Sequence, residues 1–111
     1  MVNSQLLEII RSQLSPAQLE QALVYRDPEL LHAGEATGIV GDVSVMPFDG
    51  ILVFADLAPQ FNWAHPCLFI LVPNEDANPQ VVKASFPPKS RGFPKRFQLL
   101  MQYGQVISDS S

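Results

Sequence analysis

The chain has 111 residues, of which 47% are hydrophobic and 16% are charged, and its formal net charge is −4. This length predicts one domain over residues 1–111, and the apolar fraction excludes disorder as its main state. Apolar runs such as residues 67–72 are far shorter than the roughly 18 residues that span a bilayer, and the first residues lack a secretory signal pattern. A lone cysteine forms no internal disulfide, so we expect a cytoplasmic protein that does not bind membranes.

Residues 4–33 are predicted to form an N-terminal helical hairpin or a kinked pair of helices. Apolar residues recur at spacings of three and four between Leu6 and Leu14, which is the period of an amphipathic helix. Ser15 and Gln18 have the spacing of a capping box, with a proline at the first helical position, so a second helix is expected there. An Asp-Pro pair at residues 27–28 predicts a short third helical turn.

Four strands of an antiparallel β-meander are predicted within residues 38–86. Runs of β-branched and aromatic residues alternate there with Gly, Pro, Asn and Asp. The expected strands are residues 38–46, 51–57, 67–72 and 80–86. The last strand is expected at an edge of the sheet, because it carries Lys83 and is flanked by prolines.

The two middle strands are apolar on both faces, so both faces of the sheet need a cover. The N-terminal helices are expected to cover one face. The other is covered either by the C-terminal segment or by a partner, which includes a second copy in a homodimer.

Residues 87–96 are predicted to form a basic, proline-rich loop, which we call the basic loop. A C-terminal helix is expected over about residues 94–103, because Phe97, Leu100 and Met101 keep helical spacing. An added strand is the alternative for this segment. The predicted fold is thus α+β, with an N-terminal helical hairpin, a four-stranded meander and a C-terminal helix.

Catalytic and metal-binding patterns are weak. Cys67 follows His65 at a spacing of two, so a small cysteine enzyme is one hypothesis, although a cysteine in an apolar strand is usually an inert core residue. Glu29 and His32 have a spacing that suits one metal ion, but no second histidine is near. We therefore predict no enzyme, no metal and no cofactor.

Charge is divided unevenly along the chain. Residues 1–80 carry two basic and ten acidic side chains, a net charge of −8, whereas residues 81–111 carry five basic and one acidic, a net charge of +4. Phenylalanines lie among the cations of residues 83–97, a combination that can contact phosphates and stack on bases. A binder of nucleic acid or of an anionic ligand is therefore the alternative function, disfavoured by a pI near 4.9.

A second candidate loop, residues 58–66, contains the only tryptophan, and we call it the tryptophan loop. Large rings in a loop are favoured anchors for a partner. We therefore predict a non-enzymatic protein-binding module, such as an adaptor, a chaperone of assembly or secretion, or an inhibitor, that acts through a sheet face and these two loops. The expected contact residues are Phe61, Trp63, His65, Lys89, Arg91, Phe93, Lys95 and Arg96.

Overall fold

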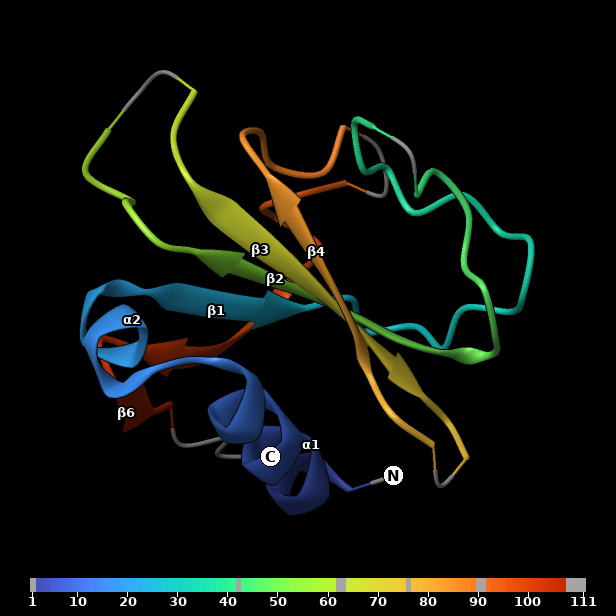
Figure 1. Ribbon diagram of the computed structural model, residues 1–111, viewed down its shortest axis with the longest axis horizontal. Coiled ribbons are helices and arrows are strands. Elements are labelled where there is room, and N and C mark those ends of the chain that lie inside the picture. The colour runs from blue at the N-terminus through green and yellow to red at the C-terminus, as the bar shows by residue number, and fades with distance from the viewer. Residues whose placement is uncertain (1, 42, 62–63, 76, 90–91, 108–111) are drawn as a thin grey trace.

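The computed structural model describes residues 2–41, 43–61, 64–75, 77–89 and 92–107. Two helices come first, α1 (Asn3–Gln13) and α2 (Pro16–Gln21). The strands are β1 (Leu23–Arg26), β2 (Gly50–Asp56), β3 (Cys67–Pro73), β4 (Gln80–Ala84), β5 (Gln98–Gln102) and β6 (Gln105–Val106). All pairings are antiparallel, in the order β4-β3-β2-β1-β5-β6 (Figure 1). The fold is α+β, but its sheet has six strands instead of the predicted four.

The predicted C-terminal helix is wrong, because residues 98–102 form β5 beside β1. The register of this pair shifts between Val24 and Tyr25, so that Leu100 is an extra residue opposite β1. Such a bulge lets two consecutive residues face the same way. As a result, Leu100 and Met101 are both buried in one core cluster. Two adjacent apolar residues are typical of an amphipathic helix, which is why the sequence of this strand predicts a helix.

The helical hairpin over residues 4–33 is also wrong in its second half. The capping box begins α2 as predicted, since the Gln18 amide donates to Ser15 Oγ at 3.1 Å and the Ser15 amide donates to Gln18 Oε1 at 2.9 Å. The helix then ends, and the chain enters β1, where Val24 and Tyr25 point to opposite faces of the sheet. Asp27 begins no helix; its carboxylate is fully buried in an ion pair.

Of the four predicted strands, three are confirmed as β2, β3 and β4, with β4 at the edge. The predicted strand over residues 38–46 is wrong, because the described residues there form only an isolated bridge between Ala36 and Val45. Gly38 and Gly41 have φ values of 78° and 141°, which lie outside the extended conformation of a strand. The described residues of the 27–49 segment instead form an irregular loop.

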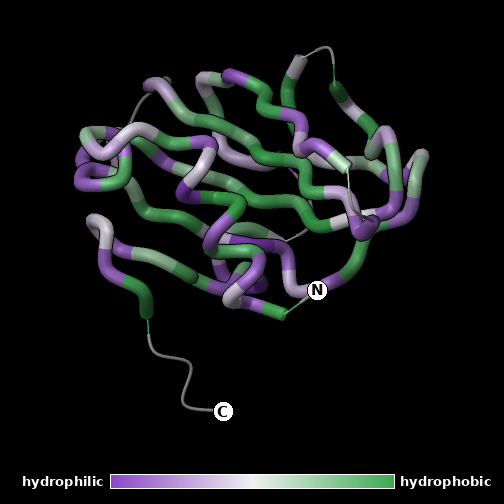
Figure 2. The backbone as a smooth tube through the Cα atoms, turned by 60° about the horizontal axis from the view of Figure 1, so that its bottom comes forward, coloured by the Kyte–Doolittle hydropathy of each residue, from purple (hydrophilic) through white to green (hydrophobic). Residues whose placement is uncertain are grey.

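Both faces of the sheet are covered from within the described part of the chain. On the helix-covered face, α1 and α2 pack on aliphatic strand residues, which include Val24, Ile51, Val53, Ile70, Val72 and Leu100. On the loop-covered face, residues from 27–49 and 92–97 pack on larger side chains, which include Leu52, Phe54, Phe69 and Leu71. Figure 2 shows hydrophobic residues concentrated along the central strands. The central strands are therefore buried on both faces, whereas Val81 on β4 is 39% exposed.

The helices of the described residues are also too short and too polar to cross a bilayer.

Candidate binding site

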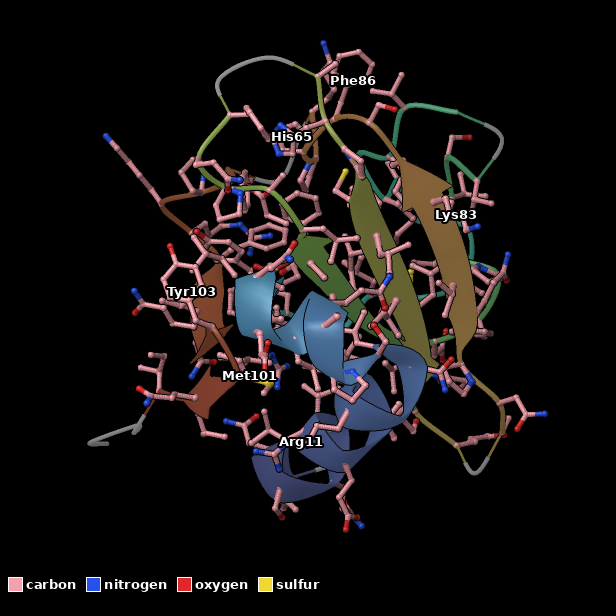
Figure 3. All side chains as sticks on the ribbon, turned by 60° about the vertical axis from the view of Figure 1, so that its left-hand side comes forward. Arg11, His65, Lys83, Phe86, Met101 and Tyr103 are labelled. Carbon is pink, nitrogen blue, oxygen red and sulfur yellow. The ribbon has the colours of Figure 1, made fainter. Side chains whose placement is uncertain are left out.

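A pocket of about 440 Å³ lies at the end of the sheet where β2 ends, β3 begins and β4 ends. Its lining comes from β2, the tryptophan loop, residues 85–86 after β4 and the basic loop: Phe54, Asp56, Phe61, Ala64, His65, Ser85, Phe86, Pro87 and Phe93. Figure 3 shows His65 and Phe86 at this end of the molecule, where the two loops converge. The two loops that were predicted separately as contact surfaces therefore form one site.

Part of the pocket wall is made of tightly packed aromatic rings. Phe54 is almost fully buried and lies in edge-to-face contact with Phe93, with ring centroids 5.1 Å apart. Phe93 makes two further edge contacts, with Tyr25 at 5.1 Å and with Phe97 at 5.2 Å. This part of the wall belongs to the core and is preformed.

Two phenylalanines of the pocket remain accessible to solvent. Phe61 is 41% exposed and Phe86 is 43% exposed, although large aromatic side chains are normally well buried. They come from different loops, and each has apolar area left to bury. An apolar group that enters the pocket would contact both.

A histidine that is hydrogen-bonded to a carboxylate supplies the polar part of the site. His65 Nε2 lies 2.7 Å from Asp56 Oδ1, and both side chains are largely buried. Because an ionised carboxylate only accepts, Nε2 carries the proton in this pair. The Ala58 amide donates to the same oxygen at 3.1 Å, and the His65 amide donates to the Ser85 carbonyl at 3.2 Å. These bonds fix the imidazole ring and tie the tryptophan loop to the end of β4.

Asp56 is a site residue that sequence reasoning missed. In the β2–β3 register Asp56 pairs with Cys67, two residues after His65. The ten residues 57–66 connect two apolar strands and return the chain so that His65 lies beside Asp56, but this can be recognised only once the strand register is known. Phe54 and Phe86 were missed for the same reason.

Cys67 has the environment of a structural cysteine. It is 2% exposed, and its thiol donates to the Phe86 carbonyl at 3.4 Å. Burial raises the pKa of the Cys67 thiol to about 11, and the nearby charge of Asp56 acts in the same direction. A thiol in this state is protonated at neutral pH, which disfavours a role as a nucleophile.

The potential metal ligands around His32 differ in burial. Asp27 is fully buried, whereas the His32 side chain is 69% exposed. Among the described residues, no three His, Cys, Asp or Glu side chains are grouped so as to hold a metal ion.

The predicted basic contact residues are distributed over different environments. Arg96 Nη2 donates to both carboxylate oxygens of Asp27 at 2.8 Å, and its Nη1 lies 3.5 Å from Glu29 Oε1. The Lys89 ammonium group lies over the Phe86 ring, 5.7 Å from its centroid. Lys95 is exposed to solvent. Of these three, Lys89 has a ring contact with a pocket residue.

Of the eight predicted contact residues, Phe61, His65 and Phe93 line the pocket. Trp63 and Arg91 lie outside the described residues. Phe93 and Phe97 are packed against other rings, so they do not form an open stacking platform for bases. The site is a pocket with apolar walls and one oriented imidazole.

Comparison of the chain with protein-family models, with curated proteins and with solved structures found no match. The functional argument therefore depends on the residues of the site and on their chemistry.

Proposed function

We propose that the protein is a non-enzymatic binding module that holds a segment of a partner polypeptide, with a large apolar side chain of that segment in the pocket between the two loops. The observation that carries this proposal is the half-exposed pair Phe61 and Phe86 on a pocket whose other rings are fixed in the core. We further propose that the module acts in the cytoplasm, where a lone buried thiol stays reduced.

Preorganisation favours binding at this pocket. Phe54 and Phe93 are already held by ring contacts, so a ligand does not have to order them. Because these side chains lose little conformational entropy when a ligand binds, less of the free energy gained by burying apolar surface is offset. The pocket also lies within the roughly 300–1,000 Å³ range of ligand sites.

A polypeptide fits the surroundings better than an isolated small molecule does. A second pocket of about 380 Å³ adjoins the first and shares Phe61 with it. Its lining includes three glutamines, Gln18, Gln21 and Gln60. Glutamine amides both donate and accept hydrogen bonds, as the backbone of an extended peptide requires. A chain that crosses Phe61 would use both pockets.

The test is a selection of binders from a random twelve-residue peptide library displayed on phage. Enriched peptides are then synthesised with a fluorescent label, and their dissociation constants are measured by anisotropy. We expect peptides with a recurring large apolar residue. We expect Phe86→Ala to weaken them by about 2 kcal/mol or more, roughly 30-fold, as for an interface hot spot.

Leu30→Ala is the matched control, because Leu30 is also 43% exposed and does not line the pocket. It should leave the dissociation constants unchanged. The proposal is wrong if the selection enriches no peptide, or if the two variants lose affinity equally. A second copy of the chain is one possible partner, and a mass that rises with concentration in light scattering identifies it.

A further inference from the structure

The two loops around the pocket have an unusual charge. The tryptophan loop contains no Asp, Glu, Lys or Arg, and the basic loop contains four cations and no carboxylate. The other residues of the chain therefore carry a net charge of −8, against +4 for the basic loop. The basic loop, which supplies Pro87 and Phe93 to the pocket lining, is thus the segment in which this acidic chain gathers positive charge.

Lys89 is the cation that the structure places beside the pocket. Its ammonium group lies over the ring of Phe86, and its backbone amide donates to the Gly38 carbonyl at 2.8 Å. The lysine is exposed, so its charge is open to a ligand. The anchoring amide bond keeps this part of the loop against the 27–49 segment.

Two further charged groups of the described structure, Asp56 in the pocket lining and Arg96 three residues after Phe93, have partners inside the molecule. The Asp56 carboxylate binds His65 and the Ala58 amide. The Arg96 guanidinium binds Asp27 and Glu29. At physiological salt the screening length is about 8 Å, so acidic residues farther away add little to the potential at Lys89.

From these observations, and on the basis of the proposed function, we propose that the partner segment carries carboxylates next to its apolar anchor residue, and that Lys89 is the residue that selects them. The anchor enters the pocket against Phe86, and a carboxylate beside it pairs with the ammonium group over the same ring. An apolar residue flanked by acidic residues thus complements the site in both shape and charge. Phosphate groups of a nucleic acid would satisfy only the charge.

The probes are four labelled nine-residue peptides that differ at defined positions. The first is Gly-Ser-Glu-Glu-Phe-Glu-Glu-Ser-Gly; the others replace all four Glu by Gln, all four Glu by Lys, or Phe by Ala. Anisotropy gives their dissociation constants at 50 and 300 mM NaCl. We expect the Glu peptide to bind about two- to fivefold more tightly than the Gln peptide at low salt, which is the size of an exposed ion pair. The Lys peptide should be the weakest of the three Phe peptides.

Variants at two exposed lysines then show which residue is responsible for the preference for the Glu peptide. Lys89→Ser should abolish the advantage of the Glu peptide over the Gln peptide, and Lys89→Glu should favour the Lys peptide instead. Lys83→Ser is the matched control, because Lys83 is exposed on β4 and makes no contact with a pocket ring in the described structure. It should leave the preference unchanged.

The outcomes separate this inference from the proposed function. If the Glu and Gln peptides bind equally and neither binds to Phe86→Ala, the charge preference is wrong but the apolar pocket is still supported. Equal effects of Lys83→Ser and Lys89→Ser also overturn it. If no Phe peptide binds more tightly than the Ala peptide, the proposed function fails as well. If a twelve-nucleotide oligothymidine displaces the Glu peptide, the cations bind nucleic acid, and the inference is overturned.

Discussion

The two faces of the sheet are covered by different means. The helix-covered face is closed by α1 and α2, whose apolar residues repeat with the helical period and pack on aliphatic strand residues. The loop-covered face is closed by two irregular segments that bring larger side chains and a buried ion pair. Periodicity alone positions the first cover, whereas the second depends on polar contacts between residues far apart in the sequence. The candidate binding site lies under the second cover.

The contacts that hold the loop cover are few and specific. Arg96 binds Asp27 across 69 positions of the sequence. Thr37 is fully buried, and its hydroxyl donates to the Val43 carbonyl and accepts from the Ile39 amide. Such groups stabilise the fold only when each has its partner, since an unpaired buried polar group is costly.

The largest effect is expected when Arg96→Met removes the partner of a buried carboxylate. Asp27 is 0% exposed and would lose both hydrogen bonds from the Arg96 guanidinium, so we expect a loss of about 3–5 kcal/mol in the free energy of unfolding. Urea denaturation measures this loss. Hydrogen exchange should accelerate first at the amides of the 27–49 loop, such as Thr37, and later in α1.

Lys95→Met is the control for that variant, because Lys95 is a neighbouring cation on the surface. Surface substitutions usually change stability by less than about 0.5 kcal/mol. Similar losses in the two variants would mean that the ion pair does not hold the loop cover.

A somewhat smaller effect is expected on the helix-covered face. Ile10 on α1 is fully buried, and Ile10→Ala should cost about 2–5 kcal/mol through lost burial and a cavity. The loss should leave peptide binding at the pocket unchanged once the protein is folded, because α1 lines no part of it. Glu8→Ala, on the exposed side of the same helix, is the control. A parallel loss of binding in Ile10→Ala would show that the two faces are coupled.

The smallest effect is a pH dependence that originates at Cys67. Its native pKa of about 11 lies above that of an unfolded thiol, so the native state holds the proton more tightly. Stability should be complete below roughly pH 8.5 and should fall toward pH 11, by up to about 1.4 kcal/mol per pH unit. The difference between the wild type and Cys67→Ala in urea denaturation at pH 7.5, 9 and 10 isolates this contribution.

Tyrosines and lysines titrate in both of those proteins and cancel in the comparison. If the stability of the wild type and of Cys67→Ala changes with pH in the same way, the raised pKa of the Cys67 thiol is contradicted. Slow labelling of the native thiol by a maleimide is expected on the same grounds, because the side chain is 2% exposed.

Sequence reasoning succeeded where local patterns decide the structure. The capping box at Ser15 and Gln18 marks the start of α2, and uninterrupted apolar runs mark β2 and β3. It failed where the structure depends on pairing between strands that are far apart in the sequence. β1 has four residues and directly follows a helix, so its period is too short to recognise, and the bulge at Leu100 gives β5 a helical spacing.

The site was predictable to a similar extent. Proline-bounded loops and exposed rings pointed to Phe61, His65 and Phe93, which are brought to one pocket. The interpretation of Arg96 as a contact residue did not anticipate its ion pair with Asp27, since nothing local connects positions 27 and 96. The unequal distribution of charge along the sequence thus has a partly structural role, because Arg96 of the basic loop forms an ion pair with Asp27 in the acidic part of the chain.

The position of β1 has a consequence for the integrity of the chain. β1 lies between β2 and β5, so one of its two hydrogen-bonding edges is covered only by residues 98–102. A chain that is cut or stalled before residue 98 would present that edge as unpaired N–H and C=O groups, beside the buried side chain of Val24. Exposed strand edges of this kind recruit other chains. Such a fragment is expected to aggregate during synthesis or after proteolysis, and light scattering of residues 1–97 would detect it.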